Sequence, residues 1–160
     1  MRSYRRTAIV GGLLLLALWL SQLPRVQLIR LRLTRQCPGC NLEKVNLATM
    51  DLHQVDLRQA RLRAANLREA DLSGANLAAA DLQESNLSLA NLSQTNLTNA
   101  DLQAADLSGV NLVRANLQFA NLTRATLLFA DLSNSDLTGA RLHQAELHGA
   151  ILPPGFRPVW

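Results

Sequence analysis

The chain has 160 residues, and its 16 lysines and arginines against 12 aspartates and glutamates give a formal net charge of +4. This sum conceals two opposite parts: residues 1–40 carry +7, while residues 41–152 hold all 12 acidic residues against eight basic ones and carry −4. A basic groove for nucleic acid is therefore not expected on residues 41–152.

Residues 1–24 form a basic and hydrophobic leader, in which several arginines precede an apolar run from Ala8 to Leu20. The run is shorter than the roughly 20 residues of a membrane span and is typical of a signal peptide. No small-x-small cleavage site follows it. We expect an uncleaved signal-anchor that holds the protein at a membrane. The alternative is a cleaved leader, with export to a periplasm or a thylakoid lumen. Arginines flank the run on both sides, so the positive-inside rule assigns no orientation.

Residues 25–39 predict a short amphipathic helix and a Cys-x-x-Cys lead-in to the segment that follows. Val26, Ile29 and Leu33 share one face of this helix. We expect the helix to cover the open end of the next domain, where strand edges and core side chains would otherwise be exposed.

Cys37 and Cys40 are the only cysteines of the chain. A buried core thiol at Cys40 and a structural disulfide between the two are both open, and the disulfide is favoured if the domain lies outside the cytosol. A zinc site needs about four ligands, and the histidines do not cluster with the cysteines in the sequence. Thioredoxin-like chemistry would need a βαβ context, which is absent.

Leucine stands at every fifth position from Leu42 to Leu152, which makes 23 consecutive pentads. A period of five fits neither a helix nor a flat strand, so the chain must turn about every five residues, as in a solenoid. The residue two positions before the leucine is alanine in 15 of 23 pentads, and the residue before it is Asn in ten and Asp in eight. Short Asn and Asp side chains suit this place because they can bond nearby backbone groups at a turn.

The repeat A-(D/N)-L-x-x over residues 40–152 resembles that of pentapeptide repeat proteins, and the helix with its Cys-x-x-Cys lead-in is similar to members of that family. The resemblance implies an all-β fold, a right-handed quadrilateral parallel β-helix with four pentads per coil and just under six coils, preceded by an N-terminal helical segment. In the first coil the small-residue positions are not alanine, which predicts a wider, more apolar layer beneath a cap; they are Cys40, Val45, Met50 and Val55. Residues 153–160 predict a C-terminal cap, because prolines cannot extend a ladder.

Two candidate surfaces stand out from the repeat. Leu128 and Phe129 point outward on one side and, with Phe156 and Trp160 of the C-terminal cap, predict a contact for self-association, such as a homodimer through the C-terminal end, or for a partner. A local basic cluster in the early coils either faces anionic lipid or is ordinary solvated surface; its members are Arg58, Arg61, Arg63 and Arg68.

These features predict a non-enzymatic, membrane-tethered scaffold that presents a stiff polar surface to an unknown protein partner, with no cofactor, metal or nucleic acid. No catalytic triad, phosphate loop or carboxylate pair can be singled out. Two other classes stay open. The first is a DNA-mimicking protein that binds a type II topoisomerase, as some family members do, although −4 is weak beside duplex DNA, which has one charge per ~1.7 Å. The second is a redox protein that uses Cys37 and Cys40.

Overall fold

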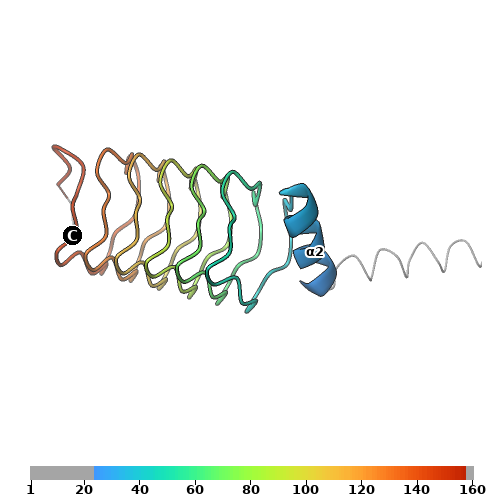
Figure 1. The fold of residues 1–160 in the computed structure, drawn as a ribbon. Helices are drawn as coiled ribbons and strands as arrows, with labels where there is room; N and C mark the ends of the chain where they lie inside the picture. The colour runs from blue at the N-terminus through green and yellow to red at the C-terminus, as the bar shows by residue number, and fades with distance from the viewer. Residues whose placement is uncertain (1–23, 158–160) are drawn as a thin grey trace, which may run out of the picture.

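The computed structural model describes residues 24–157, which comprise one helix and a stack of coils (Figure 1). The helix, α2, spans Pro24–Thr34 and lies across one end of the stack. Within residues 24–157, no helix is both long and apolar enough to span a membrane. The predicted leader, apart from Pro24, and Trp160 of the predicted C-terminal cap lie outside the described residues.

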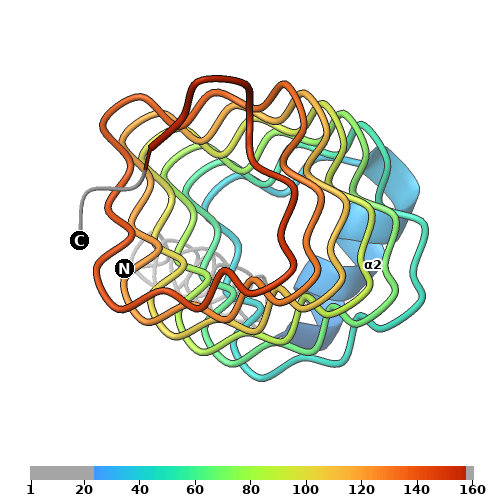
Figure 2. The same cartoon turned by 90° about the vertical axis from the view of Figure 1, so that its left-hand side faces the viewer.

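The coils are joined by isolated parallel bridges, in which every fifth residue pairs with the one twenty positions later, from Gln36 with Asp56 to Asp131 with Ile151. Twenty residues per coil correspond to four pentads, as the resemblance implied. Figure 2, which looks along the stack, shows the coils following one another around a common interior. The expected strands are reduced to single bridged residues separated by turns, because the chain changes direction before a longer strand can form.

The pairing begins earlier than the predicted start of the repeats at residue 40. Gln36 is already bridged, and the N–H of Cys37 donates to the next coil at 2.8 Å, as the N–H groups of the repeat leucines do from Leu42 to Leu132. Cys37 therefore occupies a leucine position, and Cys40 occupies the small-residue position that follows. We call residues 36–152 the tower.

Pentads in the middle coils that carry Asn or Asp before the leucine satisfy their backbone N–H groups by one scheme, seen in the pentad that begins at Ala100. Asp101 donates to the preceding coil at 2.9 Å, while Leu102 and Ala104 donate to the following coil at 2.8 and 3.0 Å. Ala100 closes the preceding turn, and Gln103 donates to Oδ1 of Asp101 at 3.1 Å. All five donors are thus paired without a long strand.

The predicted role of Asn and Asp is confirmed throughout the repeats. In all 18 pentads that carry one of them before the leucine, its Oδ1 accepts the N–H two residues later. That N–H points away from both neighbouring coils, so the side chain supplies the acceptor that the ladder does not.

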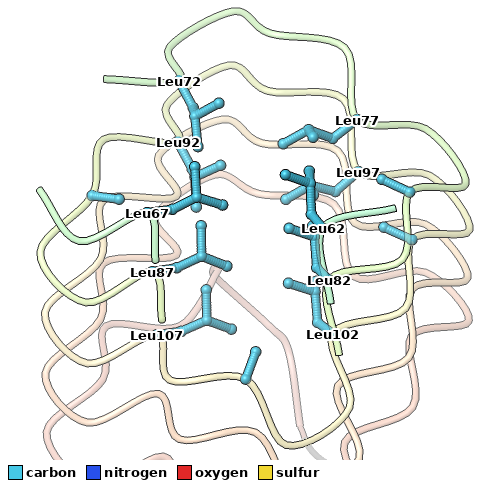
Figure 3. Close-up of a cluster of buried hydrophobic side chains, with 14 of the residues drawn as sticks. Leu62, Leu67, Leu72, Leu77, Leu82, Leu87, Leu92, Leu97, Leu102 and Leu107 are labelled. Atoms are coloured by element: carbon cyan, nitrogen blue, oxygen red, sulfur yellow. The ribbon is translucent and has the colours of Figure 1, made fainter. Parts of the chain in front are cut away.

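The core is made of stacked leucines and small residues. Leu92 and Leu97, in the middle of the tower, are fully buried. The leucines point inward in columns, each leucine twenty residues from the next, and Figure 3 labels ten of them: Leu62, Leu67, Leu72, Leu77, Leu82, Leu87, Leu92, Leu97, Leu102 and Leu107. Because the interior is narrow, an alanine is all that fits between successive leucines at most positions.

The helix covers the end of the tower as expected, but the face shared by Val26, Ile29 and Leu33 is not the side that meets the core. Gln27 and Leu31 of α2 are buried, whereas Val26, Ile29 and Leu33 are 40%, 57% and 79% exposed. The segment after Thr34 sets the rotation of α2 about its own axis, because it turns directly into the first bridge at Gln36. This junction brings the 27/31 side, and not the more apolar side, onto the core.

The non-alanine first layer does lie beneath the cap. Val55 is buried, while Val45 and Met50 are partly buried and packed against the core. A hollow of about 80 Å³ lies between this layer and Leu31 of α2. The larger side chains therefore fill space between coil and helix that an alanine would leave empty.

Candidate interaction surfaces

The residues that point outward most strongly sit at the third position of each turn. The turn is closed by a hydrogen bond from the small residue to the C=O of the leucine three residues earlier, such as Ala90 to Leu87 at 3.1 Å. Its third residue has a positive φ, which is 60° at Leu89 and 57° at Phe129. This backbone aims the side chain away from the core, at a corner of the coil.

On one side of the tower, large apolar residues and glycines alternate at a spacing of twenty residues. We call this the Phe129 side, and its column consists of Leu89, Gly109, Phe129 and Gly149. A Cβ placed on Gly149 would lie 2.5 Å from Cδ1 of Phe129, and one on Gly109 would lie 2.8 Å from Cδ2 of Leu89. Each large side chain therefore lies over the glycine of the next coil.

Phe129 packs against neighbouring residues yet remains 69% exposed. Besides covering Gly149, its ring meets the His148 imidazole edge to face, with 6.0 Å between ring centroids. Leu128, the residue before it, is partly exposed on the same side. The structure therefore brings Leu128 and Phe129 together, as their spacing predicts.

Phe119 repeats this arrangement on the opposite side of the tower, ten residues and half a coil from Phe129. It is 58% exposed, and a Cβ on Gly139 would lie 2.5 Å from its ring. These ring-on-glycine contacts were not predicted from the sequence. Their signal is visible in the sequence as an apolar residue followed by glycine twenty positions later.

Phe156 does not join Leu128 and Phe129 as an exposed residue. It is partly buried and packs against the core at the C-terminal end, and its N–H closes a turn to Pro153 at 3.1 Å. The cover there is partial, because Leu147 and Leu152 of the last coil are also only partly buried. Phe156 thus has the position of a plug, and Trp160 lies outside the described residues.

The four arginines of the predicted basic cluster do not form one positive surface. By their register they lie on three of the four sides of the tower, and only Arg61 and Arg63 share one. Arg58 holds the pKa of its carboxylate partner below the usual value through their hydrogen bond. Each arginine has an acidic partner, and the ion pairs are Arg58–Asp56, Arg61–Glu43, Arg63–Glu84 and Arg68–Glu69.

Cys37 and Cys40 are joined by a disulfide, with 5.3 Å between their Cα atoms. Both are buried, and the disulfide spans the first turn of the tower, which the Cys40 N–H also closes to the Cys37 C=O at 3.2 Å. The Cys37 sulfur lies 3.6 Å from the C=O of Gln27 in α2. The disulfide thus replaces a leucine–alanine pair directly beneath the cap.

Arg35 joins the cap to the tower, a contact that was not predicted from the sequence. Its guanidinium donates to Oδ2 of Asp51 at 3.2 Å and to the C=O of His53 at 2.7 Å. The Arg35 hydrogen bond, then that of His53, lowers the pKa of Asp51 to about 2. We call these three residues the cap latch.

Comparison with known proteins places the chain among repeat proteins of this architecture. The model of the family described as pentapeptide repeats, in eight copies, matches residues 40–77, 75–114 and 115–152. Among proteins with curated descriptions, none matches the chain.

Two solved structures from cyanobacteria are similar to it. Rfr23, a pentapeptide repeat protein of Cyanothece 51142, is 35% identical with a TM-score of 0.63, over 79% of this chain and 97% of that one. HetL of Nostoc sp. strain PCC 7120, a pentapeptide repeat protein involved in heterocyst differentiation regulation, is 34% identical with a TM-score of 0.64, over 77% of this chain and 66% of that one.

Proposed function

We propose that this chain, which belongs to the pentapeptide repeat proteins, is a non-enzymatic, membrane-tethered scaffold that binds a protein partner through its tower. We take the tower to be a right-handed quadrilateral parallel β-helix, the form implied by its repeat and consistent with its parallel bridges twenty residues apart. HetL, a relative of similar architecture, is involved in the regulation of differentiation, and a regulatory role by binding suits this chain too.

The exposed Phe129 carries the proposal. An aromatic ring that is 69% exposed, yet fixed over Gly149 and against His148, offers apolar area at little cost in conformational entropy. Rigid aromatic residues are frequent anchors of protein interfaces. Leu128 beside it widens the apolar surface. The partner is either another protein or a second copy of this chain.

The Asn and Asp series supports binding over catalysis. Each of these side chains accepts a hydrogen bond from its own turn, as Asp101 does from Gln103 at 3.1 Å. A carboxylate with a structural role in every coil is poorly placed to act as a general acid or base, because protonating it would remove the acceptor of a backbone N–H. The variable turn positions are the ones free to recognise a partner.

The leader and the disulfide support a location at a membrane, with the tower outside the cytosol. The apolar run from Ala8 to Leu20 favours a membrane anchor, and the Cys37–Cys40 disulfide favours a compartment outside the cytosol. Fractionation with protease digestion of intact membranes tests both. We expect the full chain in the membrane fraction, with the tower digested from outside the cytosol; a soluble chain with free thiols would contradict the tether.

The interface is tested by replacing Leu128 and Phe129 together with aspartate. We expect the charged pair to abolish the contact, since each aspartate would have to be desolvated against the partner. A photo-crosslinking residue at position 129 should give a specific adduct in cells, and sedimentation of the purified full chain would show whether that partner is a second copy. Phe119→Asp, on the opposite side, is the matched control. Adducts that are equally strong at 119 and 129, or an adduct at 129 that survives Leu128→Asp, would contradict the proposal.

A further inference from the structure

The outward face of α2 carries an apolar stripe that capping does not explain. Val26, Ile29 and Leu33 lie at spacings of three and four residues and form one stripe on the helix. The stripe faces away from the buried side that Gln27 and Leu31 make, and its three residues are 40%, 57% and 79% exposed. Three large apolar side chains in one row on an eleven-residue helix indicate a surface with a partner.

Charged residues flank this stripe on both sides. At about 100° per residue, Arg30 lies on one flank and Arg32 on the other. Both side chains are exposed, and among residues 24–157 neither forms an ion pair. The arginines of the early coils differ in this respect, because each of them has a carboxylate partner, as Arg63 has Glu84.

We propose that this stripe, Val26, Ile29 and Leu33 with Arg30 and Arg32, lies on the surface of an anionic lipid bilayer. An apolar row with cationic flanks is the pattern of a helix that rests in the interface between headgroups and acyl chains. Arginines at its edges reach the headgroups while their stems stay on apolar surface. α2 would then have one face on the tower and the other on the membrane.

The rest of the chain favours lipid over a second copy of the helix. The apolar run of the leader ends at Leu20, four residues before α2 begins at Pro24, so an inserted leader brings α2 to the bilayer surface. Residues 41–152 carry −4, so an anionic surface repels the tower and attracts its capped end. Two stripes packed face to face would instead bring arginines together without counter-charges.

The inference rests on the proposed tether. Fluorescence quenching distinguishes contact of α2 with lipid from attachment through the leader alone. Full-length chain in which Trp19 and Trp160 are phenylalanine receives a single tryptophan at Ile29, or at Phe119 on the tower as a control. Both variants are bound to vesicles of phosphatidylglycerol whose acyl chains are brominated near the headgroup. We expect bromine to quench the tryptophan at 29, with a blue shift, and to leave the one at 119 unquenched. Circular dichroism of both variants checks that the tower remains folded.

Charge reversal tests the flanks. Arg30→Glu with Arg32→Glu should weaken the quenching at position 29, because each cation at an anionic surface contributes about fivefold to docking. In phosphatidylcholine vesicles the same reversal should have much less effect.

Flotation of the same vesicles distinguishes the possible failures. A chain that floats while its tryptophan at 29 is quenched no more than that at 119 overturns the lipid contact of α2 and leaves the tether standing. A chain that does not float overturns both. If Ile29→Asp with Leu33→Asp instead converts a dimer into a monomer in detergent, the stripe is an interface between two copies, and the proposal is wrong.

Discussion

At the scale of single residues, the fold repeatedly requires a left-handed backbone conformation, which costs free energy. The third position of each turn has a positive φ, and side chains as different as those of Lys44, Ala104 and Phe129 occupy it. A residue with a Cβ in this region costs about 1–2 kcal/mol relative to a right-handed conformation. The ladder offsets this cost, since the N–H at this position bonds to the next coil, as that of Ala104 does at 3.0 Å. Glycine at this position is therefore needed only where a large side chain of the preceding coil covers it, as Phe129 covers Gly149.

Gly149→Ala tests this explanation. The new Cβ would lie 2.5 Å from the ring of Phe129. We therefore expect the free energy of unfolding, measured in urea, to fall by about 2 kcal/mol, because the positive φ and the displaced ring both add a cost. Gly39→Ala is the matched control, with φ of +67° and no atom within 4 Å of its Cβ; it should cost about 1 kcal/mol. Combining Gly149→Ala with Phe129→Ala should bring the effect of the added methyl group down to the control value. A cost independent of Phe129 would refute the contact.

Among the elements, the first turn and α2 act together as the closure of the tower. The disulfide stands where another turn has a leucine and an alanine, and the cap latch holds the end of α2 to the same coil. Arg35 itself has a positive φ of 52° and ends the helix, with its N–H bonded to the Leu31 C=O at 3.0 Å. Covering the leucine core at this end therefore depends on a short segment between Leu31 and Cys40.

Replacing the disulfide by an ordinary leucine–alanine turn tests the packing at position 37 in the absence of a cross-link. Cys37→Leu with Cys40→Ala recreates the leucine–alanine pair of the other turns, whereas alanine at both positions leaves a cavity beneath α2. We expect the leucine variant to be more stable than the double alanine variant by about 2–5 kcal/mol, the usual range for a buried leucine against alanine. Unfolding of the two variants, neither of which contains a cysteine, measures the difference. Equal stability of the two variants would mean that position 37 is not a core position.

The cap latch predicts a pH dependence. Because the pKa of Asp51 is lowered to about 2 from an ordinary value of 3.8, its contribution to stability is present above about 3.8 and is lost as the pH falls toward 2. The urea midpoint of the natural chain should therefore approach that of Asp51→Asn as the pH is lowered from 5 to 2. Other carboxylates titrate in both proteins, so the difference isolates Asp51. A constant difference over this range would exclude the latch.

At the scale of the molecule, the tower is a quasi-one-dimensional stack in which each coil is stabilised by its neighbours. The middle coils are enclosed on both sides, while α2 covers one end and Phe156 partly covers the other. In such an array the stability is the sum of coil and interface terms, so damage in a middle coil is felt at two interfaces.

Leu92→Lys tests the inward orientation of the leucines that recur at every fifth position. Leu92 is fully buried, and a lysine there would place an unpaired charge between stacked coils. We expect loss of the β signal in circular dichroism and no cooperative melting. Leu89→Lys is the control, since Leu89 is 53% exposed at a corner three residues earlier. A Leu92→Lys variant that melts like Leu89→Lys would refute the core assignment.

The sequence by itself determined the features that repeat within five residues. The period placed Leu92 inward and Phe129 outward, and the Asn and Asp before each leucine indicated a bonded turn, because these interactions lie within one corner of the chain. The tertiary structure alone decided what depends on contact between distant segments. The rotation of α2 is set by its junction with the first coil, so Leu31 faces the core and Leu33 faces away. The ion pairs Arg61–Glu43 and Arg63–Glu84 and the ring over Gly149 likewise join side chains across neighbouring coils, where the size and charge of the facing residue decide the contact.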